Sequence, residues 1–197
     1  MFTVRLEASD RPALQAHFLA LGSEDRRLRF GFAAHDSSLE RYVEGIDFER
    51  DAVFGVPGEN RGFDGITHLA LEEKHAEIGV SVLEHCRGRG IGSALVSRAA
   101  VHARNRGIQM LFMQCLSENG AIMRIARALG MKVVTEGNES EASLALPAAT
   151  PISILREAAA NQIALCDAAL RELLLPRAAK TPAATEAQAS MRHRAAG

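Results

Sequence analysis

The sequence predicts an α/β domain, of the α+β kind, built on a mixed central sheet. Segments in which apolar and polar residues alternate, as they do in strands, are interleaved with segments of helical periodicity. One apolar run, residues 108–116, has the near-continuous character of a buried central strand. With 197 residues, of which 47% are apolar, the chain is long enough for one domain with a substantial core.

The first half of the chain is expected to alternate strands with short helices. Ser9 or Asp10 can cap the first helical segment, which closes at Gly22. The predicted strands are 2–8, 51–57, 66–73 and 76–84, of which the last two form a hairpin, and the predicted helical segments are 9–22, 23–32 and 37–46.

The second half is expected to continue as helix, strand, helix and two strands. Glycines end both helices, and Ser117 is predicted to cap the second of them. The expected elements are helix 91–106, strand 108–116, helix 117–130 and the strand pair 131–136 and 141–147, which surrounds the turn 137–140.

Composition argues against several kinds of partner. The formal net charge is -1, aromatic residues make up 5% and Trp is absent, so no nucleic-acid surface is expected. Because neither an apolar N-terminal region nor a window of about 18 apolar residues occurs, we expect a cytoplasmic protein without membrane contact. No C-x-x-C pair occurs, and His68, His75 and His85 are spread across a hairpin, so no metal site is expected.

Glycines and arginines gather between a predicted strand and helix in "EIGVSVLEHCRGRGIGSALV", residues 77–96. Glycines at such a turn let backbone N–H groups face outward without a Cβ in the way. The helix N-terminus adds about half a positive charge, and Arg87 and Arg89 add more. These features predict an anion cradle suited to phosphate. The P-loop pattern is absent, and the dinucleotide pattern lacks its acidic residue after the next strand.

The pattern that fits is R-x-x-G-x-G, from Arg87 to Gly92. It resembles the acyl-CoA pyrophosphate loop of the GNAT superfamily of N-acetyltransferases, which joins the fourth strand to the third helix. The order of elements over about residues 3 to 147 is also similar to that family. The segment "SENGAIMRIARALGM" resembles the family's fourth helix, in which an Asn, here Asn119, caps the helix or contacts the cofactor. The nearest subgroup is the GNAT domain of bacterial protein lysine acetyltransferases.

The resemblance implies a GNAT domain over residues 1–148, with acetyl-CoA as co-substrate and no metal. Its mixed sheet would have about six to seven strands, splayed between the fourth and the fifth, and about four flanking helices. The backbone of Val80 and Val82 would pair with the pantetheine arm, and the pyrophosphate would lie on the glycine loop. The cofactor-binding residues are therefore predicted to be Val80, Val82, Arg87, Gly88, Arg89, Gly90, Ile91, Gly92, Ser93 and Asn119.

Glu77 is the candidate general base. An acceptor amine is mostly ammonium near pH 7 and must lose a proton before it attacks a thioester. Glu77 alternates out of phase with the apolar residues after it, so it faces the other side of the sheet. Glu72 and Glu73 on the preceding strand are its rivals, and Cys86 is expected to have no base nearby and no nucleophilic role. The Tyr that often serves as general acid in the family is replaced by Ala126, so the acid stays open between water, the proton of the amine, Ser117 and Cys115.

Two functions of different classes follow from the resemblance. The first is an acetyl-CoA-dependent N-acetyltransferase that acts on a primary amine, either a protein lysine or a small molecule, by direct attack in a ternary complex. Its oxyanion would be stabilised by a backbone N–H at the splay. The alternative is a non-catalytic acyl-CoA-binding regulatory module, which Ala126 favours. A protein that only binds partners through its C-terminal helix is a third possibility.

The C-terminal part of the chain is predicted to form an amphipathic helix over residues 149–176, followed by a disordered tail, 177–197. The helix carries an apolar stripe at steps of three and four residues: Ile152, Leu155, Ala159, Ile163, Cys166, Leu170 and Leu173. Such a stripe either docks on its own domain or pairs with another chain. A homodimer contact is favoured, because the family core is complete by Pro147.

Overall fold

The computed structural model describes residues 1–59 and 62–174. Contacts between residues divide the chain into two units, Met1–Leu165 and Cys166–Gly197. The first unit contains the whole sheet, and the second begins inside the last helix, whose backbone is described to Leu174. The predicted tail, 177–197, lies outside the described residues. No helix within the described ranges is long and apolar enough to cross a membrane.

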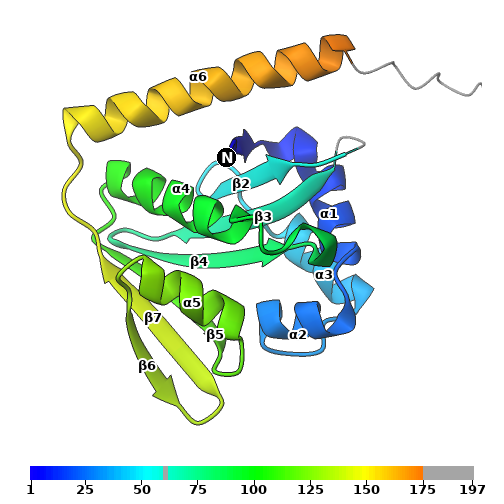
Figure 1. The fold of residues 1–197 in the computed structure, drawn as a ribbon, viewed down its shortest axis with the longest axis vertical. Coiled ribbons are helices and arrows are strands. Elements are labelled where there is room, and N and C mark those ends of the chain that lie inside the picture. Colours follow the sequence, from blue (N-terminus) through cyan, green and yellow to red (C-terminus); the bar gives the residue numbers. More distant parts are fainter. Residues whose placement is uncertain (60–61, 175–197) are drawn as a thin grey trace, which may run out of the picture. The chain divides into compact units, whose positions relative to one another are not determined.

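The described strands form one seven-stranded mixed sheet in the order β1-β2-β3-β4-β5-β7-β6 (Figure 1). All neighbours are antiparallel except β4 and β5, which run parallel. This confirms the predicted fold class, although β3 begins at Phe63 rather than at Ile66. The strands are β1 Val4–Leu6, β2 Ala52–Pro57, β3 Phe63–Leu71, β4 His75–Val82, β5 Met110–Leu116, β6 Lys132–Glu136 and β7 Glu139–Ala145.

Helices cover both faces of the sheet (Figure 1). One face carries α4, which packs on β2, β3 and β4, together with α5. The other face carries α1 and α3, and α2 lies over β4 and β5. The helices are α1 Arg11–Leu19, α2 Ser23–Phe30, α3 Asp36–Glu44, α4 Ile91–Asn105, α5 Gly120–Ala128 and α6 Pro151–Leu174.

The pairing of β4 with β5 is short. His75–Glu77 pair with Met110–Phe112, whereas β4 stays paired with β3 as far as Val82. Beyond Glu77 the two parallel strands diverge, which is the predicted splay between the fourth and fifth strands. The second half of β4 therefore has no strand beside it on the β5 side.

Each face of the sheet has its own apolar core. On one face Ile78 of β4 and Leu111 of β5 are fully buried together with Leu95 of α4, and on the opposite face Leu14 and Phe18 of α1 are fully buried. Burying a Leu or Phe side chain contributes roughly 1.5–3 kcal/mol. The two cores fix the strands on either side of the splay, so the site built there rests on rigid elements.

The helix after β5 is capped by Asn119, as the resemblance implied, and not by Ser117, which the sequence pattern predicted. Asn119 is the N-cap of α5, and its Oδ1 accepts a hydrogen bond from the Ile122 N–H at 3.2 Å. The prediction that Ser117 caps this helix is wrong. Ser117 directly follows β5, and its N–H donates to the carbonyl of Asn138 at 2.9 Å. Asn and Ser are comparable caps, so composition alone did not separate them.

The first part of α6, residues 151–165, docks on α4 through polar side chains. Glu157 accepts hydrogen bonds from His102 Nδ1 and Asn105 Nδ2, both at 2.7 Å, and pairs with Arg98 at 3.3 Å. Burial by itself raises the pKa of Glu157, but the hydrogen bonds from His102 and Asn105 and the charge of Arg98 outweigh it and bring the pKa to about 2. Glu157 is therefore an ionised anchor between the two helices.

The apolar stripe of α6 faces solvent instead. Ile152, Leu155 and Ile163 are 65%, 70% and 61% exposed, whereas Ser153 and Ala164 are buried. The sequence left two alternatives for the stripe, docking on its own domain or pairing with another chain. In residues 151–165 the stripe does not dock on its own domain. The physical reason is that α4 presents charged and amide groups, which need polar partners when they are covered.

A buried histidine joins α1 to the sheet. His17 is 3% exposed, and its Nδ1 and Nε2 each lie 2.8 Å from a polar group, the Phe63 carbonyl and the Ser81 hydroxyl. A carbonyl only accepts, so Nδ1 carries the proton and Nε2 accepts from Ser81. Burial lowers the pKa of His17 to about 4, which keeps the ring neutral.

Folding stability is expected to fall as the pH drops from about 6.5 to about 4. In this window the unfolded chain protonates His17, whose ordinary pKa is 6.5, while the folded chain does not. The loss from this residue is expected to reach about 3 kcal/mol. The free energy of unfolding is measured with urea across this pH range for the wild type and for His17→Gln, whose amide can both donate and accept a hydrogen bond. The variant should lose most of the pH dependence. An unchanged pH dependence would contradict its assignment to His17.

Candidate active site

The loop between β4 and α4 has the backbone of the predicted cradle. Gly88 and Gly90 have φ of +75° and +79°, in the left-handed region that glycine enters freely. Gly90 is the N-cap residue of α4, so the first N–H groups of that helix face the loop. A Cβ added at either glycine would meet nothing within 4 Å, so open space adjoins the loop. The loop thus offers N–H groups and the helix dipole to an anion.

A pocket of about 510 Å³ runs from this loop along β4 to α2 and α5. The side chain of Ile91 is only 3% exposed, so Ile91 contributes mainly its backbone to the pocket. Arg89 is not among the residues that line it. The structure brings all the other predicted cofactor-binding residues to this one pocket: Val80, Val82, Arg87, Gly88, Gly90, Ile91, Gly92, Ser93 and Asn119.

The backbone of β4 faces the gap left by β5. In an antiparallel pair, successive residues alternate in the direction of their N–H and C=O groups. The N–H of Leu83, just after β4, donates to the Asp64 carbonyl at 2.9 Å, so the odd-numbered residues face β3. Val80 and Val82 therefore direct their backbone groups to the opposite side, beyond the point where β5 diverges. An extended chain that carries amides can pair with them there.

Neighbouring side chains hold both arginines of the loop. Arg87 forms an ion pair with Asp25 of α2, and Arg89 donates to the sulfur of Cys86 at 3.8 Å. Asp25 also lines the pocket, although no sequence pattern indicated this role. Because 46% of the Arg87 side chain is exposed, the pair with Asp25 is open to competition from a second anion.

Asn119 holds two helices together at the pocket. Its Oδ1 caps α5, and its Nδ2 donates to the carbonyl of Leu28 in α2 at 3.4 Å. Both Asn119 and Leu28 line the pocket. The predicted capping role thus also sets the distance between α2 and α5.

A second pocket, of about 610 Å³, shares Leu28 and Arg29 with the first. Glu77 lines this second pocket, at the last paired position of β4 before the splay. Its rivals Glu72 and Glu73 line neither of these two pockets. Glu77 is therefore the one of the three candidates that the fold brings next to the junction.

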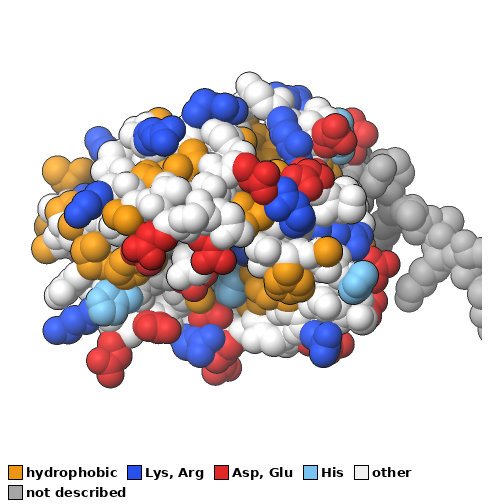
Figure 2. Space-filling view, turned by 90° about the horizontal axis from the view of Figure 1, so that it is seen from below, with side chains coloured by type: hydrophobic (Ala, Val, Ile, Leu, Met, Phe, Trp, Pro, Cys, Tyr) orange, Lys and Arg blue, Asp and Glu red, His pale blue; other side chains and the backbone are white. Residues whose placement is uncertain are grey.

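Acidic side chains are frequent in the lining of the second pocket. Besides Glu77, the β6–β7 hairpin contributes Glu136, Glu139 and Glu141, while Arg29 supplies a positive charge. Figure 2 views the molecule from the end at which this hairpin turns, and several acidic side chains, in red, face the viewer there. The excess of negative charge attracts cations to this pocket.

The sequence matches one known protein family. A sequence model described as the acetyltransferase (GNAT) family matches residues 12–131. The chain belongs to this family. The predicted resemblance to this family is thereby confirmed.

Several known proteins are similar to this chain at low sequence identity. Streptothricin acetyltransferase of Streptomyces lavendulae is 26% identical over 114 residues, which cover 55% of this chain and 60% of that protein. The GNAT domain of S. lividans PAT has a TM-score of 0.63 at 18% identity, covering 73% of this chain and 89% of its own. The yncA protein of Salmonella typhimurium, solved with its cofactor acetyl-CoA, has a TM-score of 0.57 at 19% identity, covering 76% and 96%.

The first pocket of this GNAT domain fits acetyl-CoA. The space next to Gly88 and Gly90 is open, and the N–H groups at the start of α4 face it. The free backbone groups of Val80 and Val82 follow along the same pocket. When bound, acetyl-CoA supplies the activated acetyl group; the chain's residues would hold its pyrophosphate at the loop and its arm along β4.

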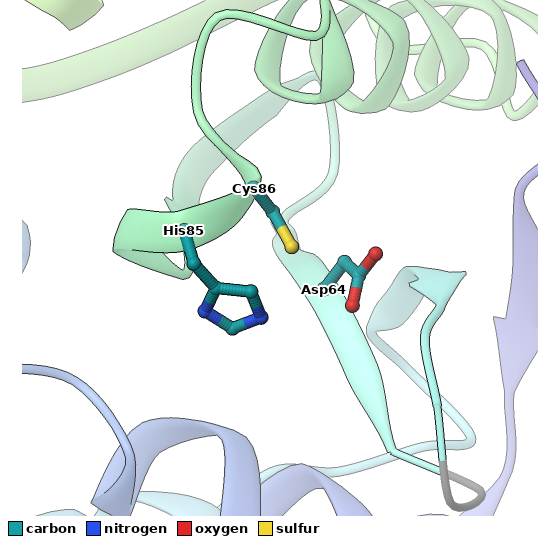
Figure 3. A group of neighbouring side chains, drawn as sticks. All are labelled: Asp64, His85 and Cys86. Carbon is teal, nitrogen blue, oxygen red and sulfur yellow. The ribbon is translucent and has the colours of Figure 1, made fainter.

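Cys86 has two titratable neighbours at the edge of the GNAT loop. Asp64, His85 and Cys86 each place one donor atom within 4.8 Å of the others, and the sulfur points towards the carboxylate (Figure 3). Burial and the hydrogen bond with Asp64 raise the pKa of the Cys86 thiol, which disfavours the nucleophilic thiolate. The guanidinium of Arg89 beside the sulfur disfavours a bound cation as well. The prediction that Cys86 has no base nearby is therefore wrong, although its raised pKa agrees with the absence of a nucleophilic role.

Two residues of the GNAT site, Asp25 and Arg29, were missed by sequence reasoning. Both lie in α2, whose sequence "SEDRRLRF" carries so many charges that none stands out. Only the placement of α2 over β4 and β5 shows which of them point inward. The position of Ala126 is 1% exposed and offers no proton donor, so the general acid stays unassigned.

Proposed function

We propose that this GNAT protein transfers the acetyl group of acetyl-CoA to a primary amine by direct attack in a ternary complex. The observation that carries this proposal is the meeting of two pockets at Leu28 and Arg29. One pocket ends in the phosphate cradle and the other contains the carboxylate of Glu77, so cofactor and acceptor can be bound together. A module that only binds acyl-CoA would need the first pocket alone.

The reaction begins with proton transfer to Glu77. An acceptor ammonium in the second pocket gives one proton to this carboxylate, directly or through a water molecule. The neutral nitrogen then attacks the thioester carbon, which forms the C–N bond and places a negative charge on the carbonyl oxygen. When this oxyanion collapses, the C–S bond breaks and the thiolate of CoA leaves. The second nitrogen proton goes to the thiolate or to water, and the products are an amide and CoA.

The charge of the second pocket supports a cationic acceptor. Glu136, Glu139 and Glu141 would attract an ammonium group towards Glu77. By their names, one relative acts on streptothricin, and another, from Brucella melitensis, on an alanine of a ribosomal protein. Small-molecule amines and amino groups of proteins, lysines among them, are therefore both proposed as acceptors for this chain.

Turnover of acetyl-CoA separates the transferase from the binding module. The full chain is mixed with acetyl-CoA and a panel of small amines, polyamines and lysine-containing peptides, and the released thiol of CoA is measured. We expect saturable release of CoA with at least one cationic amine. Calorimetric binding of acetyl-CoA without turnover of any amine would instead support the regulatory module.

We also propose that α6 mediates a homodimer. Ile152, Leu155 and Ile163 lie exposed along one side of the helix, and a second copy of the same stripe can cover them isologously. Covering each of these side chains is worth roughly 1.5–3 kcal/mol.

Light scattering is expected to give the mass of a dimer for the full chain. The double variant Leu155→Glu with Ile163→Glu should give a folded monomer, because both side chains are exposed in the single chain. A wild-type monomer at all accessible concentrations would rule out the dimer.

A further inference from the structure

Arg29 lies where the two pockets of the proposed transferase meet. It lines both of them, and its guanidinium lies against Gly79 of β4: a Cβ at Gly79 would be 2.1 Å from Arg29 Nη2. Side chains alternate along a strand, so this guanidinium lies on the same face of β4 as Glu77. Arg29 thus occupies the start of the splay, next to the candidate base.

A chain of hydrogen bonds fixes the guanidinium. Arg29 Nη2 donates to Tyr42 Oη at 2.9 Å, Tyr42 Oη lies 2.7 Å from His68 Nδ1, and His68 Nε2 lies 3.1 Å from Asp51 Oδ2. A carboxylate only accepts, so Nε2 carries the proton of His68. Burial lowers the pKa of His68, so the ring is neutral and Nδ1 accepts from the Tyr42 hydroxyl. The Tyr42 oxygen is then directed at Arg29 as an acceptor.

The charge of Arg29 has no carboxylate partner among the described residues. Its Nε is buried and makes no hydrogen bond to any of them. Its central carbon lies 4.9 Å and 5.7 Å from the ring centres of Phe30 and Tyr42, which confine it further. A fixed cation with unused donors at a pocket junction is preorganised for an anion.

We propose that Arg29 is a catalytic residue that donates a hydrogen bond to the thioester carbonyl oxygen and stabilises the oxyanion formed on attack by the amine. This inference rests on the proposed acetyl transfer. The reacting carbon must lie where the cofactor pocket meets the acceptor pocket, which is where Arg29 lies. Arg29 gains and loses no proton in the reaction. Tyr42, His68 and Asp51 are positioning residues, and Gly79 leaves the room that the guanidinium needs.

The first test measures binding and needs no acceptor. S-carboxymethyl-CoA has a methylene in place of the thioester carbonyl carbon and a carboxylate in place of the acetyl methyl group, so it presents a negative charge to Arg29 one bond from the reacting carbon. In calorimetry, Arg29→Met is expected to weaken binding of S-carboxymethyl-CoA by roughly 10- to 100-fold and to leave binding of CoA unchanged. Arg27→Met is the matched control, because Arg27 lies on the same helix, pairs with Glu24 and Glu118, and lines neither pocket.

Two further variants keep the charge of Arg29 but disturb its position. In Gly79→Ala the new Cβ displaces the flexible end of Arg29, so the same selective loss of affinity is expected in a folded protein. Tyr42→Phe removes the acceptor of the Arg29 hydrogen bond and should produce a smaller loss in the same direction. Melting temperatures close to that of the wild type show that each variant is folded.

Kinetics with an acceptor from the amine panel give the second readout. Arg29→Met is expected to lower kcat roughly 10²- to 10³-fold at unchanged acceptor KM. A raised acceptor KM at unchanged kcat would show that Arg29 binds the acceptor instead, and equal affinity of wild type and Arg29→Met for S-carboxymethyl-CoA would overturn the proposal. If the wild type binds CoA but acetylates no amine, the proposed transferase function is wrong. The affinities of wild type and Arg29→Met for S-carboxymethyl-CoA still test the role of Arg29 in that case.

Discussion

Gly90→Val is expected to abolish measurable binding of acetyl-CoA in a protein that still folds. The new side chain would fill the open space beside the loop, where the pyrophosphate is proposed to lie. It would also oppose the φ of +79° that Gly90 adopts as the N-cap of α4. Because several charged hydrogen bonds are lost together, the affinity should fall by more than roughly 100-fold. Isothermal calorimetry with acetyl-CoA measures this directly.

The matched control for Gly90→Val is Gly107→Val. Gly107 has a φ of +83° and equally open space around it, but it lies at the other end of α4. Both variants should lose about 1–2 kcal/mol or more of folding stability, since both force a branched residue into the left-handed region. Only Gly90→Val should lose the cofactor. Wild-type affinity in Gly90→Val would end the assignment of the loop to pyrophosphate.

Glu77→Gln is expected to lower kcat roughly 10²- to 10⁴-fold, which is the usual effect of losing a general base. The amide keeps the shape of the side chain but cannot take the proton of the acceptor ammonium. Binding of acetyl-CoA should hardly change, because Glu77 lines the second pocket and not the first. Steady-state kinetics with the acceptor, together with calorimetry of the cofactor, separate these two effects.

High pH should partly rescue Glu77→Gln. More of the acceptor amine is then already neutral, so the missing base matters less. A lost structural contact would show no such rescue. Glu73→Gln serves as the control, because Glu73 lies at the β3–β4 turn and lines neither pocket. If Glu73→Gln lost activity while Glu77→Gln kept it, the base would have to be reassigned to that turn.

The glycine loop could be predicted from the sequence because local patterns determine it, whereas the splay was expected only from the resemblance to the GNAT family. Only glycine enters the backbone conformations of Gly88 and Gly90 freely, so the positions of these residues predict the loop directly. The near-continuous apolar run of β5 similarly marks a central strand.

The role of Arg29 could not be predicted, because it depends on contacts between distant segments. Its partner Tyr42 is in α3, and the chain continues to His68 in β3 and Asp51 before β2. No spacing within α2 marks Arg29 among its neighbours. The docked face of α6 could not be predicted for the same reason: the polar groups of α4 selected Glu157 and Ser153 over the apolar stripe.

The divergence of β4 from β5 leaves the sheet with open edges in its interior. An exposed strand edge invites another chain to add to it, and proteins usually cover or shorten such edges. Here the proposed cofactor arm would act as a surrogate strand beside Val80 and Val82, so the ligand completes the fold as well as taking part in the reaction. A ligand that binds only the folded state stabilises it in proportion to RT ln(1 + [L]/Kd). The resistance of this domain to unfolding and strand addition would therefore follow the supply of acetyl-CoA.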